Sequence, residues 1–145
     1  MPDSNTINFP AQKAKIELKF NEFIVLKEPE KNILLSPPQK KRVEAKVRGK
    51  SVIVEFPAKL DSATTYTLYF GNSIEDNNEG NKFPGYRYSF STGGYIDSML
   101  VTGLIVDAAT LLPVPGALVA FYADHSDSAL YKKLPASLAR SDQWG

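Results

Sequence analysis

Residues 42–56 have the sequence RVEAKVRGKSVIVEF, in which two alternating segments flank the pair Gly49-Lys50. A two-residue loop with glycine first favours a type II′ turn, whose twist matches that of two antiparallel strands. In this register the apolar side chains share one face in pairs: Val47 with Val52, Ala45 with Val54, and Val43 with Phe56. A shift of one residue would mix apolar and charged side chains on that face. The stretch therefore predicts a β-hairpin with a well-specified register.

Further strands are predicted on both sides of this hairpin. Apolar and polar residues alternate with a period of two, as in half-buried strands, at two places: Ile16, Leu18 and Phe20, and Tyr86, Tyr88 and Phe90. Residues 64–70 are rich in the β-branched and aromatic residues that strands favour. A short apolar run at 33–35 is stopped by Pro37-Pro38, since proline cannot donate to a ladder. Residues 71–85 are polar and predict a loop.

Beyond Gly93-Gly94 a second series of strand and turn patterns begins. Residues 98–106 and 116–123 predict two strands, and the prolines between them predict a turn. Residues 127–139 predict a loop, with one helical turn before Pro135 as the alternative.

The domain prediction follows from that glycine pair. It is a β-sandwich over residues 1–93 and a partial second β module over residues 97–145, so the fold class is all-β. Residues 142–145 resemble a turn that leads into a further strand, which is expected to lie outside this sequence.

The composition of the chain excludes several classes of protein. The 145 residues are 43% hydrophobic and 23% charged, with a net charge of +1, so the charge does not predict a nucleic-acid partner. The chain has no cysteine, which excludes disulfides, thiolate metal sites and cysteine nucleophiles. No apolar run reaches the ~20 residues of a membrane helix, and residues 1–5 do not have the pattern of a signal peptide.

Several stretches in order resemble the bacterial Ig-like domain of the S-layer-protein type. They are Ile16 to Glu22, Leu35 to Pro38, Leu60 to Leu68, Ile74 to Asn81 and Phe90 to Gly93. The resemblance covers about residues 1–93 and implies an Ig-like sandwich. It also implies a role for Tyr66 as the tyrosine corner of the sandwich. In a tyrosine corner the hydroxyl forms a hydrogen bond to the backbone of the preceding turn.

The remaining sequence is similar to the start of a carboxypeptidase-regulatory-like (prealbumin-like) β-sandwich. The similarity rests on Val101 to Ala108 and Pro115 to Val119. Together the two resemblances imply an extracytoplasmic protein of the bacterial cell envelope, a lipoprotein of the outer membrane or surface as in Bacteroidetes-like bacteria. They imply protein partners in the envelope, and a membrane contact only through an anchor outside this sequence.

Two motifs could carry chemistry. His125 lies between Asp124 and Ser126, but neighbouring residues do not converge as a catalytic triad requires; the prediction is an exposed loop histidine and no catalytic residue. The loop at 75–81 is dense in oxygen ligands, and Glu75, Asn77 and Glu79 are calcium candidates. The same residue types also serve turns. Turn structure without a metal is the preferred interpretation, so no cofactor is predicted.

Two surface features have simple structural explanations. The basic residues from Lys40 to Lys50 lack interleaved aromatics and predict the solvent face of the hairpin. The seven tyrosines predict mainly packing pairs across strands, with an exposed sugar-stacking row as the alternative.

The function predicted from the sequence is therefore a structural spacer and interaction module, not an enzyme. The alternative is a module for glycan binding or calcium-dependent adhesion. Because a partial sandwich leaves an open sheet edge, self-association of the chain through that edge is a further expectation.

Overall fold

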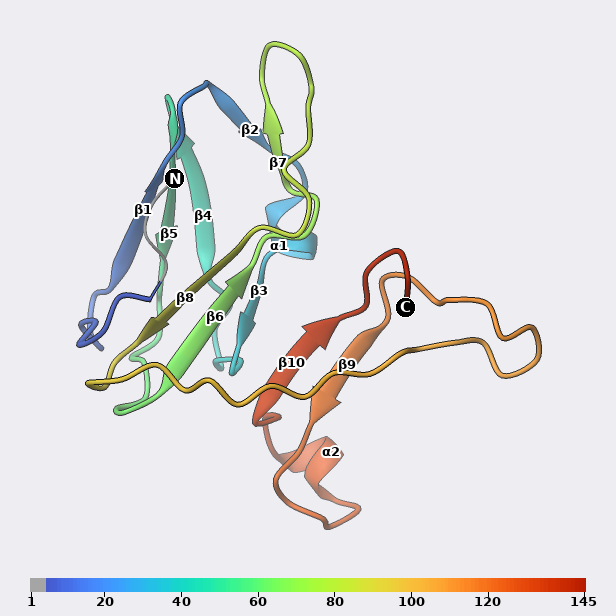
Figure 1. Ribbon diagram of the computed structural model, residues 1–145. Helices are drawn as coiled ribbons and strands as arrows, with labels where there is room; N and C mark the ends of the chain where they lie inside the picture. Colours follow the sequence, from blue (N-terminus) through green and yellow to red (C-terminus); the bar gives the residue numbers. More distant parts are fainter. Residues whose placement is uncertain (1–4) are drawn as a thin grey trace.

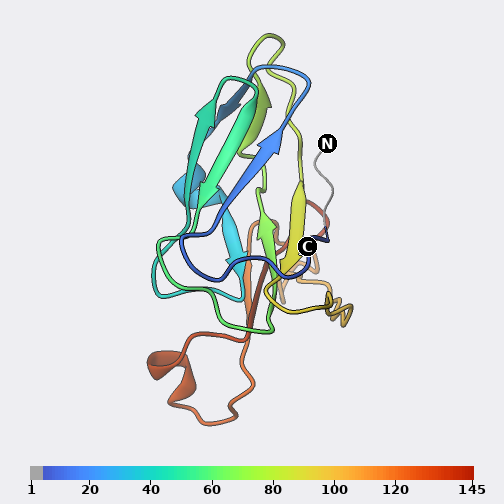
Figure 2. The ribbon, with the colours of Figure 1, turned by 90° about the vertical axis from the view of Figure 1, so that its left-hand side faces the viewer.

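The computed structural model describes residues 5–145, and most of its regular secondary structure is antiparallel β-strand (Figure 1). One sheet has the order β1-β5-β4, with bounds Lys15–Lys19, Ser51–Glu55 and Glu44–Arg48. The other has the order β3-β6-β8, with bounds Leu34–Ser36, Thr65–Tyr69 and Arg87–Ser91. In Figure 2 the β1-β5-β4 sheet faces the viewer. This division into two three-stranded sheets corresponds to strands B, E and D and strands C, F and G of an immunoglobulin fold.

Three smaller pairs of elements complete the chain. Strand β2 (Ile24–Leu26) pairs with β7 (Ile74–Asp76), and β9 (Leu118–Phe121) pairs with β10 (Ser137–Arg140). The helices α1 (Pro29–Asn32) and α2 (Ala129–Lys132) are each a single turn. The fold class predicted from the sequence, all-β with an Ig-like sandwich, is confirmed.

The predicted hairpin is confirmed in its register. In the ladder between β4 and β5, Ala45 lies opposite Val54 and Val47 opposite Val52. Gly49 has a φ of +61° and Lys50 has no positive φ, the combination of a type II′ turn. Val52 and Val54 are buried, whereas Val47 is 39% exposed, because β4 is the edge strand of its sheet.

The core lies between the two sheets and is formed by alternate residues of each strand. Its fully buried large side chains include Leu18, Val52, Val54, Leu60, Tyr66, Leu68, Phe70, Ile74 and Phe90. Phe90 is the centre of an aromatic cluster, with ring centroids 4.6 Å from Phe9, 5.4 Å from Phe56 and 5.5 Å from Tyr66. The alternation seen in the sequence is thus the alternation between core and solvent.

The N-terminal segment covers one edge of the second sheet. Thr6 forms a parallel bridge to Phe90 in β8. The backbone N–H of Asn5 donates to Ser89 O at 2.8 Å, and that of Phe9 donates to Ser91 O at 2.9 Å. Residues 5–9 therefore extend this sheet beyond β8.

The prediction of a loop over residues 71–85 is wrong at β7, which pairs with β2. Both strands have only three residues, too few for alternation to be recognised in the sequence. Pro29 is the first residue of α1, where the missing N–H of proline costs no hydrogen bond.

The C-terminal predictions are partly wrong. Residues 98–106 form no strand, and only Val106 makes an isolated bridge, to Pro113. Among residues 5–145 no strand pairs with this segment, and a β-strand needs such a partner. The strand predicted over 116–123 is confirmed as the shorter β9, whereas the loop predicted over 127–139 contains α2 and most of β10.

The two parts of the chain differ in how they bury apolar side chains. Almost all of the core comes from residues 14–90, with Ala129 of α2 the exception. Large apolar side chains are exposed along residues 95–144, and Val101 is 90% exposed. Within residues 5–145 no helix is long and apolar enough to cross a bilayer. The boundary near residue 93 and the partial second module stay predictions.

Candidate functional site

Tyr66 is fully buried at the start of β6 and holds the preceding turn through its hydroxyl. The phenol oxygen accepts a hydrogen bond from the backbone N–H of Asp61 at 2.9 Å and lies 3.2 Å from Asp61 Oδ2, to which it donates. It also accepts from Gln39 Nε2 at 2.8 Å. Burial, together with the neighbouring Asp61 carboxylate, raises the pKa of Tyr66 to about 12. The phenol therefore stays neutral at physiological pH, and we propose that it is the tyrosine corner of this sandwich.

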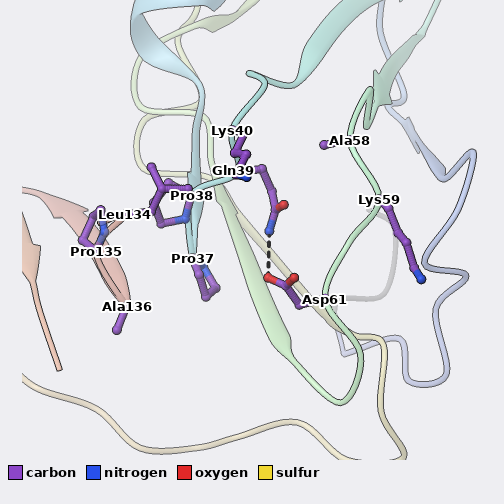
Figure 3. Close-up of a pocket in the computed structure, with 10 residues that line it drawn as sticks. All are labelled: Pro37, Pro38, Gln39, Lys40, Ala58, Lys59, Asp61, Leu134, Pro135 and Ala136. Carbon is purple, nitrogen blue, oxygen red and sulfur yellow. Dashed lines mark hydrogen bonds between the residues drawn. The ribbon is translucent and has the colours of Figure 1, made fainter. Parts of the chain in front are cut away.

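A cavity of about 460 Å³ opens beside this turn (Figure 3). Its wall is formed by three separate segments: residues 37–40, residues 58–61 except the buried Leu60, and residues 134–136 of the C-terminal part. Asp61 is the only carboxylate in this wall, and Gln39 Nε2 donates to its Oδ2 at 3.2 Å. The lining has no histidine, serine, threonine or cysteine, so it offers no hydroxyl or thiol nucleophile with a histidine base. The lining offers the ammonium groups of Lys40 and Lys59 and the carboxylate of Asp61 for contact with a ligand or partner.

Asp124, His125 and Ser126 are not linked as a catalytic triad within residues 5–145. The residue is exposed in the loop between β9 and α2, and no hydrogen bond joins it to Ser126 among the described residues. Asp124 instead accepts from the Ser126 N–H at 2.8 Å and forms an ion pair with Lys133. The Lys133 ammonium group and the Ser126 N–H hold the pKa of Asp124 well below its usual range. The Asp124 carboxylate therefore stabilises the conformation of this loop.

The oxygen-rich loop uses its central carboxylate to close a turn. Asp76 is buried, and its two oxygens accept from the N–H groups of Asn78 at 2.9 Å and Glu79 at 3.1 Å. Glu79 accepts from the Asn81 amide at 2.7 Å. Because successive strand residues point to opposite faces, Glu75 lies on the other face of β7 from Asp76. In residues 5–145 no three acidic or histidine side chains are grouped as a metal site.

We expect calcium to leave the stability of the chain unchanged. The calcium candidates are Glu75, Asn77 and Glu79, and Glu75 lies on the other face of β7 from Asp76, whose two oxygens already accept backbone hydrogen bonds. A calcium site needs six to eight oxygen ligands. A thermal melt with and without millimolar CaCl₂ would then give the same midpoint within about 1 °C, because a ligand raises it only when it binds the native state. Magnesium is the matched control for ionic strength. A calcium-specific rise that Glu79→Gln removes would contradict this expectation.

The basic residues of the hairpin are partly neutralised by their neighbours. Lys46 Nζ lies 3.8 Å from Glu44 and 3.5 Å from Glu55. Lys50 donates to Asn21 O at 2.8 Å and lies 5.3 Å from the ring centroid of Phe23. Such exposed pairs contribute little stability, and they fit a solvated face.

The tyrosines do not form an exposed row. Tyr66 and Tyr88 are buried, Tyr86 is half-buried, and the strongly exposed Tyr95 and Tyr131 lie outside the sandwich strands. Thr6 Oγ1 and the Tyr88 hydroxyl share a hydrogen bond of 2.9 Å. Packing therefore accounts for the tyrosines of the sandwich.

The sequence reasoning missed Ser36, the last residue of β3. Its hydroxyl is buried and lies 3.0 Å from the Ser137 hydroxyl, and it accepts from the Leu138 N–H at 2.9 Å. These contacts join the sandwich to β10. No local signal could have identified Ser36, since its partners are about a hundred residues away along the chain.

The comparison with protein families agrees with this architecture. The family model described as "Bacterial Ig-like domain" matches residues 1–92, more than half of the 145 residues. Domains of that family are typically non-catalytic structural modules at the cell surface or outside the cell. None of the curated proteins and none of the solved structures compared with the chain matches it. On the strength of the sandwich and of this match, the chain belongs to the bacterial Ig-like domain family.

Proposed function

We propose that this chain is a rigid spacer and assembly module of a bacterial cell-envelope protein. The observation that carries the proposal is the joint between Ser36 and β10, because it fixes a second β unit to the side of the sandwich. In Figure 1 β10 lies beside β3, so that the β9–β10 hairpin continues the direction of the β3-β6-β8 sheet. A spacer needs such a connection, since modules on flexible linkers move independently by default.

The joint is short and is shielded from water on the Ser36 side. Ser36 is 6% exposed, and two hydrogen bonds meet at its hydroxyl oxygen. A second tie lies in the linker, where the Asp97 N–H donates to Thr65 Oγ1 of β6 at 2.9 Å. When a hydrogen bond shielded from water is broken, the polar group left without a partner costs free energy, because it has no water to replace the lost bond. The bonds at Ser36 therefore resist rotation of the hairpin against the sandwich, and the exposed bond at Asp97 holds the start of the linker on β6.

The compartment is part of the proposal. We place the module in a lipoprotein of the outer membrane or cell surface, with envelope proteins as partners and membrane attachment through an anchor outside this sequence. Cell-surface placement is typical of bacterial Ig-like domains. Protease treatment of intact cells tests the placement: cleavage of the module without lysis is the expected result, and cleavage only after lysis would contradict it.

The joint predicts the effect of replacing Ser36 with alanine. The substitution removes the acceptor of the Leu138 N–H and the partner of Ser137. Because a hydrogen bond contributes about 1 kcal/mol and 1.4 kcal/mol is tenfold, we expect Leu138 amide exchange to accelerate about fivefold to tenfold. Hydrogen exchange followed by NMR measures this. The amides of β5 and β6 should keep their protection.

Ser137→Ala is the matched control for this prediction. It removes only the bond between the two hydroxyls and leaves the bond from the Leu138 N–H to Ser36, so its effect on Leu138 exchange should be clearly smaller. Unchanged exchange in Ser36→Ala would show that the joint does not hold the hairpin, and the rigid-spacer proposal would fail.

A further inference from the structure

The edges of the sheets differ in how they are protected. Residues 5–9 cover β8, and β10 covers β3. The edge strands β1 and β4 carry charged residues at alternate positions, which opposes pairing with another strand. Strands β2 and β7 have only three residues each. Among the described strands this leaves the outer edge of β9.

Strand β9 has the features of an edge that accepts a further strand. The chain from Gly116 to Ala123 contains no charged residue and no proline. Leu118 and Phe121 are 57% and 60% exposed. An exposed, uncharged and apolar edge of this kind is a template for strand addition.

The hydrogen-bonding direction of β9 can be derived from its ladder. The carbonyl of Ala117 accepts from the Ser141 N–H at 2.9 Å, and the carbonyl of Phe121 accepts from the Ala136 N–H at 2.8 Å. These carbonyls point to the β10 side, and backbone groups alternate in direction along a strand. The N–H and C=O groups of Leu118 and Ala120 therefore point to the free edge.

We propose that β9 of a second copy of this chain pairs antiparallel with β9 across a two-fold axis. The contact is isologous, so the same segment faces itself. Because that segment is uncharged, antiparallel self-pairing places no like charges opposite one another, a situation that would destabilise the pair. The two hairpins then form one four-stranded sheet, β10-β9-β9-β10. This assembly goes beyond the spacer role and stands whether or not the Ser36 joint is rigid.

Sedimentation equilibrium of the whole chain tests the proposal. From micromolar to millimolar concentration we expect the average mass to rise from that of a monomer to that of a dimer. Ala120→Pro removes an N–H that points to the free edge and spares the ladder with β10, so it should raise the dissociation constant by about tenfold or more. Val47→Lys on the β4 edge is the matched control and should associate like the wild type.

A cross-link distinguishes the β9 contact from other ways of associating. The chain has no cysteine, so Ala120→Cys can be cross-linked to itself with a short bis-maleimide, whereas Ala45→Cys on β4 should give no dimer. Ala120→Lys is a second disrupting variant if the proline variant loses the protected Leu138 amide. A wild-type chain that stays monomeric up to millimolar concentration would overturn the proposal. So would a dimer that persists in both Ala120 variants, and so would cross-linking at Ala45 in place of Ala120.

Discussion

Replacing Phe90 with alanine is expected to lower the free energy of unfolding by about 3–5 kcal/mol, the range measured for truncating a buried phenylalanine. Phe90 is fully buried at the centre of the sandwich, where Phe9, Phe56 and Tyr66 surround its ring. The smaller alanine side chain would leave a cavity. The surrounding rings belong to different segments of the chain, and in a close-packed core they cannot all move to fill it. Urea denaturation at 25 °C measures the change.

The matched control for this prediction is another phenylalanine in a strand. Phe121 in β9 is 60% exposed, so Phe121→Ala should change the free energy of unfolding by less than about 0.5 kcal/mol. The pair of variants locates the core within the sandwich and not in the C-terminal hairpin. Equal losses in the two variants would show that the hairpin shares the core.

Replacing Tyr66 with phenylalanine is expected to lower the free energy of unfolding by about 1–3 kcal/mol at pH 7. The substitution keeps the ring on Phe90 and removes the hydroxyl that binds the Asp61 N–H and Gln39. The Asp61 N–H would then lose its partner beside the core. Thermal and urea unfolding of the two proteins measure the difference. A difference near zero would contradict the proposed tyrosine corner.

The difference in stability between the wild type and Tyr66→Phe is also expected to depend on pH. The pKa of Tyr66 is about 12 in the folded chain against 10.0 as its ordinary value, so folding favours the neutral phenol. Its contribution is present in full below pH 10 and is lost as the pH rises from 10 to 12. At 1.36 kcal/mol per pH unit, the advantage of the wild type over Tyr66→Phe should shrink by about 2–3 kcal/mol across that window. An advantage that stays constant would show that the phenol is not shielded as described.

Strands with clear alternation could be predicted from the sequence. The hairpin around Gly49 was predicted pair by pair, because both of its strands alternate and its turn is local. The proposed role of Tyr66 as a tyrosine corner came from the family resemblance, and its hydrogen bonds to Asp61 and Gln39 needed coordinates.

Features that depend on distant partners could not be predicted. Strand β10 has little alternation and becomes a strand because it pairs with β9, while the apolar residues 98–106 lack such a partner and form none. Periodicity measures how a segment would fit a sheet and not whether a neighbour is present. The role of the Ser36 side chain also depends on a distant partner, the backbone N–H of Leu138, and so could not be predicted from the local sequence.

The central claim is that the Ig-like sandwich and the C-terminal hairpin form one rigid structural unit joined at Ser36. Residual dipolar couplings of backbone amides test it most directly, because they report the orientation of each N–H vector in a common frame. Measured below the association range, amides of β1, β5, β6 and β8 and amides of β9 and β10 should fit a single alignment tensor in the wild type. A hairpin that requires its own, smaller tensor would contradict the claim.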